Sequence, residues 1–105
     1  LFELAEPPTA IFVANDEMAF GAVHHLREIG RDVPGDVSVV GFDDLYLSEA
    51  FYPPLTTVRQ PRTDIGRQAM GMLLEMLSGA AVPREPVVLP ATLRVRGTTA
   101  PPKTE

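Results

Sequence analysis

The sequence predicts an α/β fold built on a parallel, doubly wound sheet. Short apolar segments rich in β-branched residues alternate along the chain with longer segments of helical periodicity. The first apolar segments lack strict alternation of polar and apolar residues, which is typical of strands covered on both faces. Strands separated by helices need crossover connections, and these favour parallel pairing. The 105 residues are enough for one small domain.

The first half of the chain predicts a strand at residues 9–14 followed by a helix at 16–29. Asn15 or Asp16 can cap the amino end of this helix, since both side chains accept hydrogen bonds from free backbone N–H groups. Gly30 suits the left-handed conformation that commonly follows a helix. The spacing of apolar residues predicts that Met18, Ala22, Leu26 and Ile29 form the buried stripe.

A second buried strand is predicted at residues 37–42, followed by a short helical segment at 45–51 and a third strand at 55–60. Pro61 suits the first turn of another helix, which is expected to end at Gly79. Its apolar stripe consists of Ile65, Ala69, Leu73 and Met76 or Leu77.

The last strand material is predicted at residues 87–90 and 92–97. In the second of these segments Arg94 and Arg96 alternate with two apolar residues, so both arginines are expected to face water.

Composition limits the classes of function. The net charge of −5 makes this chain a poor candidate for gripping a phosphate backbone directly. The absence of cysteine excludes disulfides, thiolate nucleophiles and zinc–thiolate sites, and no apolar run is long enough to span a membrane. His24 and His25 are adjacent, so on a helix they cannot chelate one metal. No hydrolase or phosphate-binding motif is present, and we expect neither an enzyme nor a cofactor or metal site.

Two polar pairs follow the first two predicted strands. Asn15 and Asp16 come after the first, and Asp43 and Asp44 come after the second. Ligands of open parallel sheets bind outside the carboxyl ends of the strands, so these side chains can form a hydrogen-bonding site for a neutral molecule rich in OH or NH groups. Helix capping is the alternative for both pairs, and the two roles can coexist within one pair.

Two phenylalanines have no clear place in the predicted core. Phe20 lies off the apolar stripe of its helix, and Phe51 lies in a short irregular segment. An exposed aromatic pair would favour a protein–protein contact, whereas ordinary core packing is the alternative.

The stretches "ANDEMAFGA", "VPGDVSVVGFDD" and "PPLTTVRQP" occur in this order and at suitable spacing. Together they closely resemble the C-terminal part of the LacI/GalR family of bacterial transcription regulators, over about residues 8–97. The resemblance implies part of one lobe of a periplasmic-binding-protein-like effector domain. Family effectors are usually sugars and sometimes purines or nucleosides, and they change the affinity of the regulator for DNA.

The resemblance also assigns roles to individual residues. Asn15 and Asp43 fall at positions that commonly contact the effector, and Gln60 is a further candidate near the crossover between the lobes. Asp16 and Asp44 are expected to support these contacts or to cap helices. Phe20 and Phe51 fall where family dimers meet, which favours the interface interpretation.

The resemblance divides the chain into segments. Residues 1–60 are expected to be a partial C-terminal lobe, the helix at 61–79 to belong to the N-terminal lobe, residues 80–100 to return as strands, and residues 101–105 to be a disordered tail. The chain is thus expected to be a fragment of a cytoplasmic homodimer that binds operator DNA through a domain absent from this chain and binds no membrane. A periplasmic sugar-binding protein of a transport system, which shares the fold, is the alternative.

Overall fold

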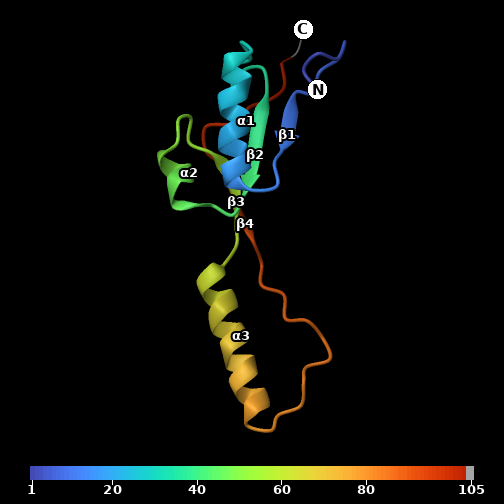
Figure 1. The fold of residues 1–105 in the computed structure, drawn as a ribbon, viewed down its shortest axis with the longest axis vertical. Helices are drawn as coiled ribbons and strands as arrows, with labels where there is room; N and C mark the ends of the chain where they lie inside the picture. The colour runs from blue at the N-terminus through green and yellow to red at the C-terminus, as the bar shows by residue number, and fades with distance from the viewer. Residues whose placement is uncertain (104–105) are drawn as a thin grey trace. The chain divides into compact units, whose positions relative to one another are not determined.

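The computed structural model of the protein describes residues 1–103. The chain divides into two units, one comprising Leu1–Arg59 with the segment that begins at Thr92, the other comprising Gln60–Ala91. Figure 1 shows the elements of both units. In chain order they are β1 (Ala10–Phe12), α1 (Asp16–Glu28), β2 (Ser38–Phe42), α2 (Tyr46–Ala50), β3 (Thr56–Arg59), α3 (Arg62–Leu77) and β4 (Thr92–Arg94).

The four strands form one sheet in the order β1-β2-β3-β4. The first three strands are parallel, and β4 pairs with β3 in the antiparallel direction. The α/β class and its parallel sheet are confirmed, with the addition of one antiparallel edge strand. The strand predicted at 87–90 was wrong, and β4 is shorter than predicted. Pro90 at the end of this segment has no backbone N–H to donate to a ladder, and Pro83 and Pro86 lie just before the segment.

The buried face of α1 differs from the stripe that the sequence predicted. Leu26 is buried as expected, but Met18 and Ile29 are exposed. Relative to the predicted orientation the helix is rotated about its axis, because Asp16 in its first turn is itself buried. The buried face of the helix consists of Asp16, Ala19, Val23 and Leu26.

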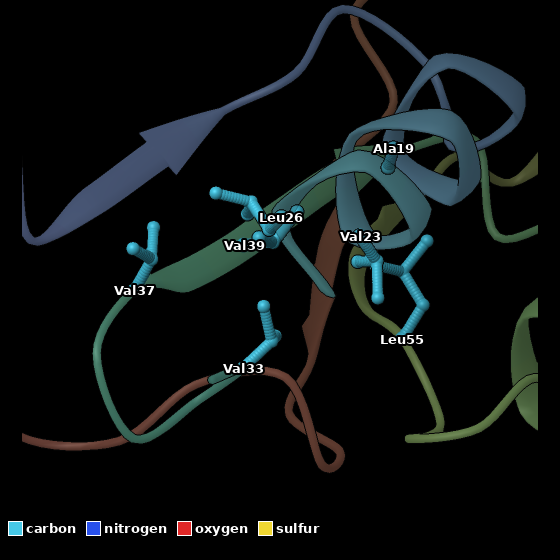
Figure 2. Close-up of a cluster of buried hydrophobic side chains, with 7 residues drawn as sticks. All are labelled: Ala19, Val23, Leu26, Val33, Val37, Val39 and Leu55. Atoms are coloured by element: carbon cyan, nitrogen blue, oxygen red, sulfur yellow. The ribbon is translucent and has the colours of Figure 1, made fainter. Parts of the chain in front are cut away.

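A small apolar core lies between α1 and the sheet, with α1 lying against β2. Figure 2 shows the apolar side chains of α1 directed toward Val39 of β2 and toward the loops that precede β2 and β3. Full burial of each large aliphatic side chain contributes about 1.5–3 kcal/mol to stability. The complete set is Ala19, Val23, Leu26, Val33, Val37, Val39 and Leu55.

The segment that follows β4 joins the starts of two parallel strands. The Thr98 hydroxyl donates to the carbonyl oxygen of Val39 at 2.7 Å and accepts from the backbone N–H of Thr56 at 2.9 Å. Farther on, Lys103 forms an ion pair with Asp36. Of the predicted disordered tail, residues 104–105 lie outside the described residues.

The second unit consists of α3 and an extended segment. The helix begins directly after Pro61, and Gly79 just beyond its end has φ of 100°. Both boundaries agree with the proline and glycine signals in the sequence. No side chain of α3 is buried within the described part of the chain.

Candidate functional site

Asn15 and Asp43 lie at the carboxyl ends of neighbouring parallel strands. In the ladder Phe12 is paired with Val40, and the backbone N–H of Val13 donates to the Val40 carbonyl at 2.8 Å. The same offset in sequence separates Asn15 from Asp43, which follow the ends of these two strands at one edge of the sheet. Both residues are half-buried. We call this feature, defined by Asn15 and Asp43, the rim.

Asn15 is the residue that caps α1. Its side-chain oxygen accepts from the backbone N–H of Met18 at 2.9 Å, and its own backbone is extended. Between the two caps that the sequence allowed, the structure therefore selects Asn15. The cap occupies the amide oxygen, and the NH₂ group of the same side chain is a donor that the cap does not use.

Asp16 lies beneath the rim and is completely buried, with 0% of its surface exposed. One carboxyl oxygen accepts from the Thr57 hydroxyl of β3 at 2.6 Å. The other accepts from the backbone N–H of Leu45 at 2.9 Å and from the Ser48 hydroxyl of α2. A single side chain therefore joins the start of α1 to β3, to α2 and to the loop before α2.

Gly41 provides the space for this carboxyl group. A Cβ atom at position 41 would lie 2.3 Å from Oδ1 of Asp16 and 3.0 Å from a Leu55 methyl group. The glycine therefore sits inside a buried strand, where it weakens intrinsic strand preference, because the Asp16 side chain crosses over it.

The turn that carries Asp43 has an uncommon backbone. Asp43 has φ of 122° and Asp44 has φ of 54°, both in the range that favours glycine. The backbone N–H of Asp43 donates to the Val58 carbonyl at 2.9 Å. The N–H of Asp44 donates to the Thr57 hydroxyl at 3.4 Å, and the next N–H, of Leu45, is held by Asp16. Three consecutive donors thus hold the turn against β3 and α1.

Asp44 is buried at this turn and pairs with arginines of β3 and of the segment after β4. Its carboxyl oxygens lie 2.8 Å from the Arg96 guanidinium and 3.9 Å from that of Arg59. Only 17% of the Arg96 side chain is exposed, so the expectation that Arg96 faces water was wrong. The ion pair and a hydrogen bond to the Leu55 carbonyl turn the side chain inward, whereas the neighbouring Val95 is exposed.

The remaining predicted residues lie elsewhere. Gln60 follows β3 and belongs to the second unit, so the rim described above does not include it. Phe20 of α1 and Phe51 at the end of α2 contact each other, with ring centroids 4.6 Å apart, and both pack against the edge of the core.

The rim combines an amide with a carboxylate, two groups whose chemistry allows hydrogen bonds to OH and NH groups. No group of three or more His, Cys, Asp or Glu side chains suited to a metal occurs within residues 1–103. Among these residues, none of the helices is long and apolar enough to cross a membrane.

Sequence reasoning missed the hydroxyl groups beneath the rim. Ser48 and Thr57 are buried and donate hydrogen bonds to Asp16. Neither residue is part of a recognisable sequence motif. One signal was present: Gly41 interrupts an otherwise apolar strand, and a glycine in that position often marks the close approach of another group.

Comparison with known proteins finds a periplasmic binding protein-like domain that matches residues 1–99. The HTH-type transcriptional repressor CytR of Escherichia coli K12 is 42% identical over 99 residues, which is 94% of this chain and 29% of that protein. The chain therefore spans less than a third of the length of this relative.

Solved structures agree with the sequence relationship. A dimeric Lac repressor with an 11-residue C-terminal deletion superposes with a TM-score of 0.84 at 43% identity, covering 91% of this chain and 35% of that one. A LacI family transcriptional regulator from Enterococcus faecium with bound ribose has a TM-score of 0.84 at 34% identity, covering 97% of this chain and 37% of that one.

Proposed function

The chain belongs to the LacI/GalR family of transcriptional regulators, within its periplasmic-binding-protein-like domain, and we propose that it forms part of the effector-sensing and dimerisation domain of a repressor. The full-length regulator would bind operator DNA through a separate domain in the cytoplasm, since the net charge of −5 disfavours contact between this chain and DNA. The observation that carries the proposal is the rim, where an amide and a carboxylate emerge from adjacent parallel strands.

The effector is a neutral, hydroxyl-rich small molecule, and a sugar fits best. Asp43 accepts hydrogen bonds from ligand hydroxyl groups. Asn15 donates to the ligand through its NH₂ group, because the helix cap uses only its amide oxygen. The ribose bound in the E. faecium regulator supports this class of ligand. Gln60, in the crossover segment, is a further residue that contacts the ligand. Asp16 and Asp44 hold the neighbouring rim residues in place.

Dimerisation involves the surface of α1 and α2 around Phe20 and Phe51. The ring pair packs on the core edge, and beside it Leu47 and Tyr52 are exposed, giving this face apolar area. The dimeric Lac repressor among the structural neighbours supports pairing of this kind. In the full-length regulator α3 belongs to the N-terminal lobe, whose surface covers the apolar stripe that the second unit exposes.

Effector binding controls DNA affinity through differential binding. A ligand that prefers one arrangement of the two lobes shifts the population toward that arrangement, and with it the geometry that the dimer presents to DNA. A periplasmic sugar receptor is not favoured, since CytR and the E. faecium protein, which match nearly all of this chain, are regulators. The coding sequence upstream of Leu1 discriminates the two: it encodes a helix-turn-helix in a regulator and a signal peptide in a receptor.

The experiment that tests the proposal is a thermal-shift panel on the full-length regulator, with ribose, other neutral mono- and disaccharides, and nucleosides. We expect at least one compound to raise the melting temperature and to change operator affinity in a gel-shift assay. Reciprocity requires that the same compound bind with different affinity in the presence of operator DNA. A full panel with no shift and no change in operator affinity would contradict the proposal.

A further inference from the structure

We propose that Asp16, acting through Thr57 and the backbone N–H of Leu45, is a positioning residue that holds the Asp43–Asp44 turn and so sets the direction of the Asp43 carboxylate. The inference rests on the proposed function, because it concerns the orientation of Asp43, the residue proposed to contact the effector. It adds a role for residues that do not themselves reach the rim.

The turn requires external restraint because its backbone is unfavourable on its own. Non-glycine residues with positive φ cost of order 1–3 kcal/mol and persist only where the surroundings determine them. Two such residues follow each other here, at Asp43 and Asp44. Without restraint, we expect the segment between β2 and α2 to adopt conformations of lower backbone energy, in which the Asp43 side chain has a different direction.

Asp16 supplies the restraint from one side of the turn. Its Oδ2 holds the N–H of Leu45 at 2.9 Å, directly after the turn. Its Oδ1 accepts the Thr57 hydroxyl at 2.6 Å, and the Thr57 oxygen in turn lies 3.4 Å from the N–H of Asp44. Both contacts therefore reach backbone groups of the turn, one directly and one through a hydroxyl group.

The opposite side of the turn is held by Arg96. Its guanidinium lies 2.8 Å from the Asp44 carboxylate and also donates to the Leu55 carbonyl at 3.0 Å. Asp16 and Arg96 therefore restrain residues 44 and 45, which directly follow Asp43 in the turn. Among residues 1–103 no buried side-chain nitrogen or oxygen lacks a hydrogen-bond partner, so the buried carboxyl groups of Asp16 and Asp44 are both satisfied.

The test uses the full-length regulator and two substitutions of Thr57. Thr57→Val keeps the shape but removes the hydroxyl that links Asp16 to the turn, whereas Thr57→Ser keeps the hydroxyl. The readout is the dissociation constant for the sugar that stabilises the wild type in the panel with ribose, measured calorimetrically well below the melting temperature of each variant. We expect Thr57→Val to weaken binding about tenfold and Thr57→Ser to bind within about twofold of wild type.

A control variant distinguishes a loss of overall stability from a change in the orientation of the Asp43 carboxylate. Val37→Ala removes methyl groups from the core before the start of β2, away from the rim, and is expected to lower the melting temperature without changing the dissociation constant. Equal affinities for Thr57→Val and wild type, with Asp43→Ala unable to bind, would overturn the positioning role alone. Undiminished binding by Asp43→Ala would overturn the rim as the effector site, on which the proposed function relies.

Discussion

The pairs Asn15–Asp16 and Asp43–Asp44 follow neighbouring strands, yet the two residues within each pair have different surroundings. Asp16 and Asp44 are buried, at 0% and 8% exposure, and each binds groups from other segments of the chain. Asn15 and Asp43 are half-buried at the rim. The comparison shows that one residue of each pair is buried in contacts with other segments of the chain, while the other is half-buried after the end of its strand.

The largest expected effect comes from Asp16→Ala. It leaves three donors without their acceptor, two of them on buried hydroxyl groups. We expect the free energy of unfolding to fall by about 3 kcal/mol or more, measured by denaturant titration of the full-length regulator. Glu17→Ala is the matched control, since Glu17 is the next residue and is exposed, and it is expected to cost about 0.5 kcal/mol. Equal costs for the two variants would contradict the stabilising role of the buried Asp16 carboxyl group.

Gly41→Ala tests the space that Asp16 occupies. The added Cβ would lie 2.3 Å from the Asp16 carboxyl oxygen, so either the side chain or the strand must move. We expect destabilisation of about 1–3 kcal/mol. The control Gly21→Ala on α1 meets no atom within 4 Å and should stabilise the protein by about 0.5–1 kcal/mol, because alanine favours a helix. Shifts of the same sign for both variants would contradict the close approach.

Substitutions of Asn15 separate its two roles. Asn15→Ala removes the cap that the N–H of Met18 requires and is expected to cost about 1 kcal/mol. Asn15→Ser retains a capping oxygen but lacks the NH₂ group, so stability should be preserved while effector binding is weakened. Thermal unfolding and ligand titration of both variants provide the check. Wild-type ligand affinity in Asn15→Ser would assign Asn15 to the cap alone.

The smallest expected effect is the pH dependence of the ion pair at Asp36. The hydrogen bond from Lys103 holds the pKa of the Asp36 carboxyl below its ordinary value of 3.8. A carboxyl group with a lowered pKa in the folded state stabilises above its unfolded pKa, and that stability is lost as the pH falls through the folded value. Lys103→Ala should therefore be slightly less stable than wild type at pH 7. The difference should shrink as the pH falls below 3.8 and vanish once the pH lies below the lowered pKa of the folded state. A difference that persists there would exclude the ion pair as its cause.

The sequence predicted the order of the main helices and strands because its periodicities and breakers were clear. Pro61, Gly30 and Gly79 mark boundaries that the structure reproduces within a few residues. The phase of α1 was wrong because counting apolar residues assigns Asp16 to the surface, and only tertiary contacts explain its burial. Two residues of the rim could be placed from the strand ends alone, since parallel strands bring their carboxyl ends to one edge.

The supporting contacts could not be predicted, since they join segments far apart in the chain. The carboxyl group of Asp16 meets Thr57, and Asp44 meets Arg96, through pairings that depend on the register of β2, β3 and β4. Alternation within a strand indicated a wet face for Arg96, but a buried carboxylate within reach overrides that pattern.

The most direct test of the account is the effector response of Asp43→Ala in the full-length regulator. The compound that shifts the wild type in the panel is titrated into both proteins, and operator affinity is measured with and without it. We predict that Asp43→Ala binds operator DNA as wild type does but no longer responds to the compound. A retained response at wild-type ligand concentrations would contradict the assignment of the rim as the effector site.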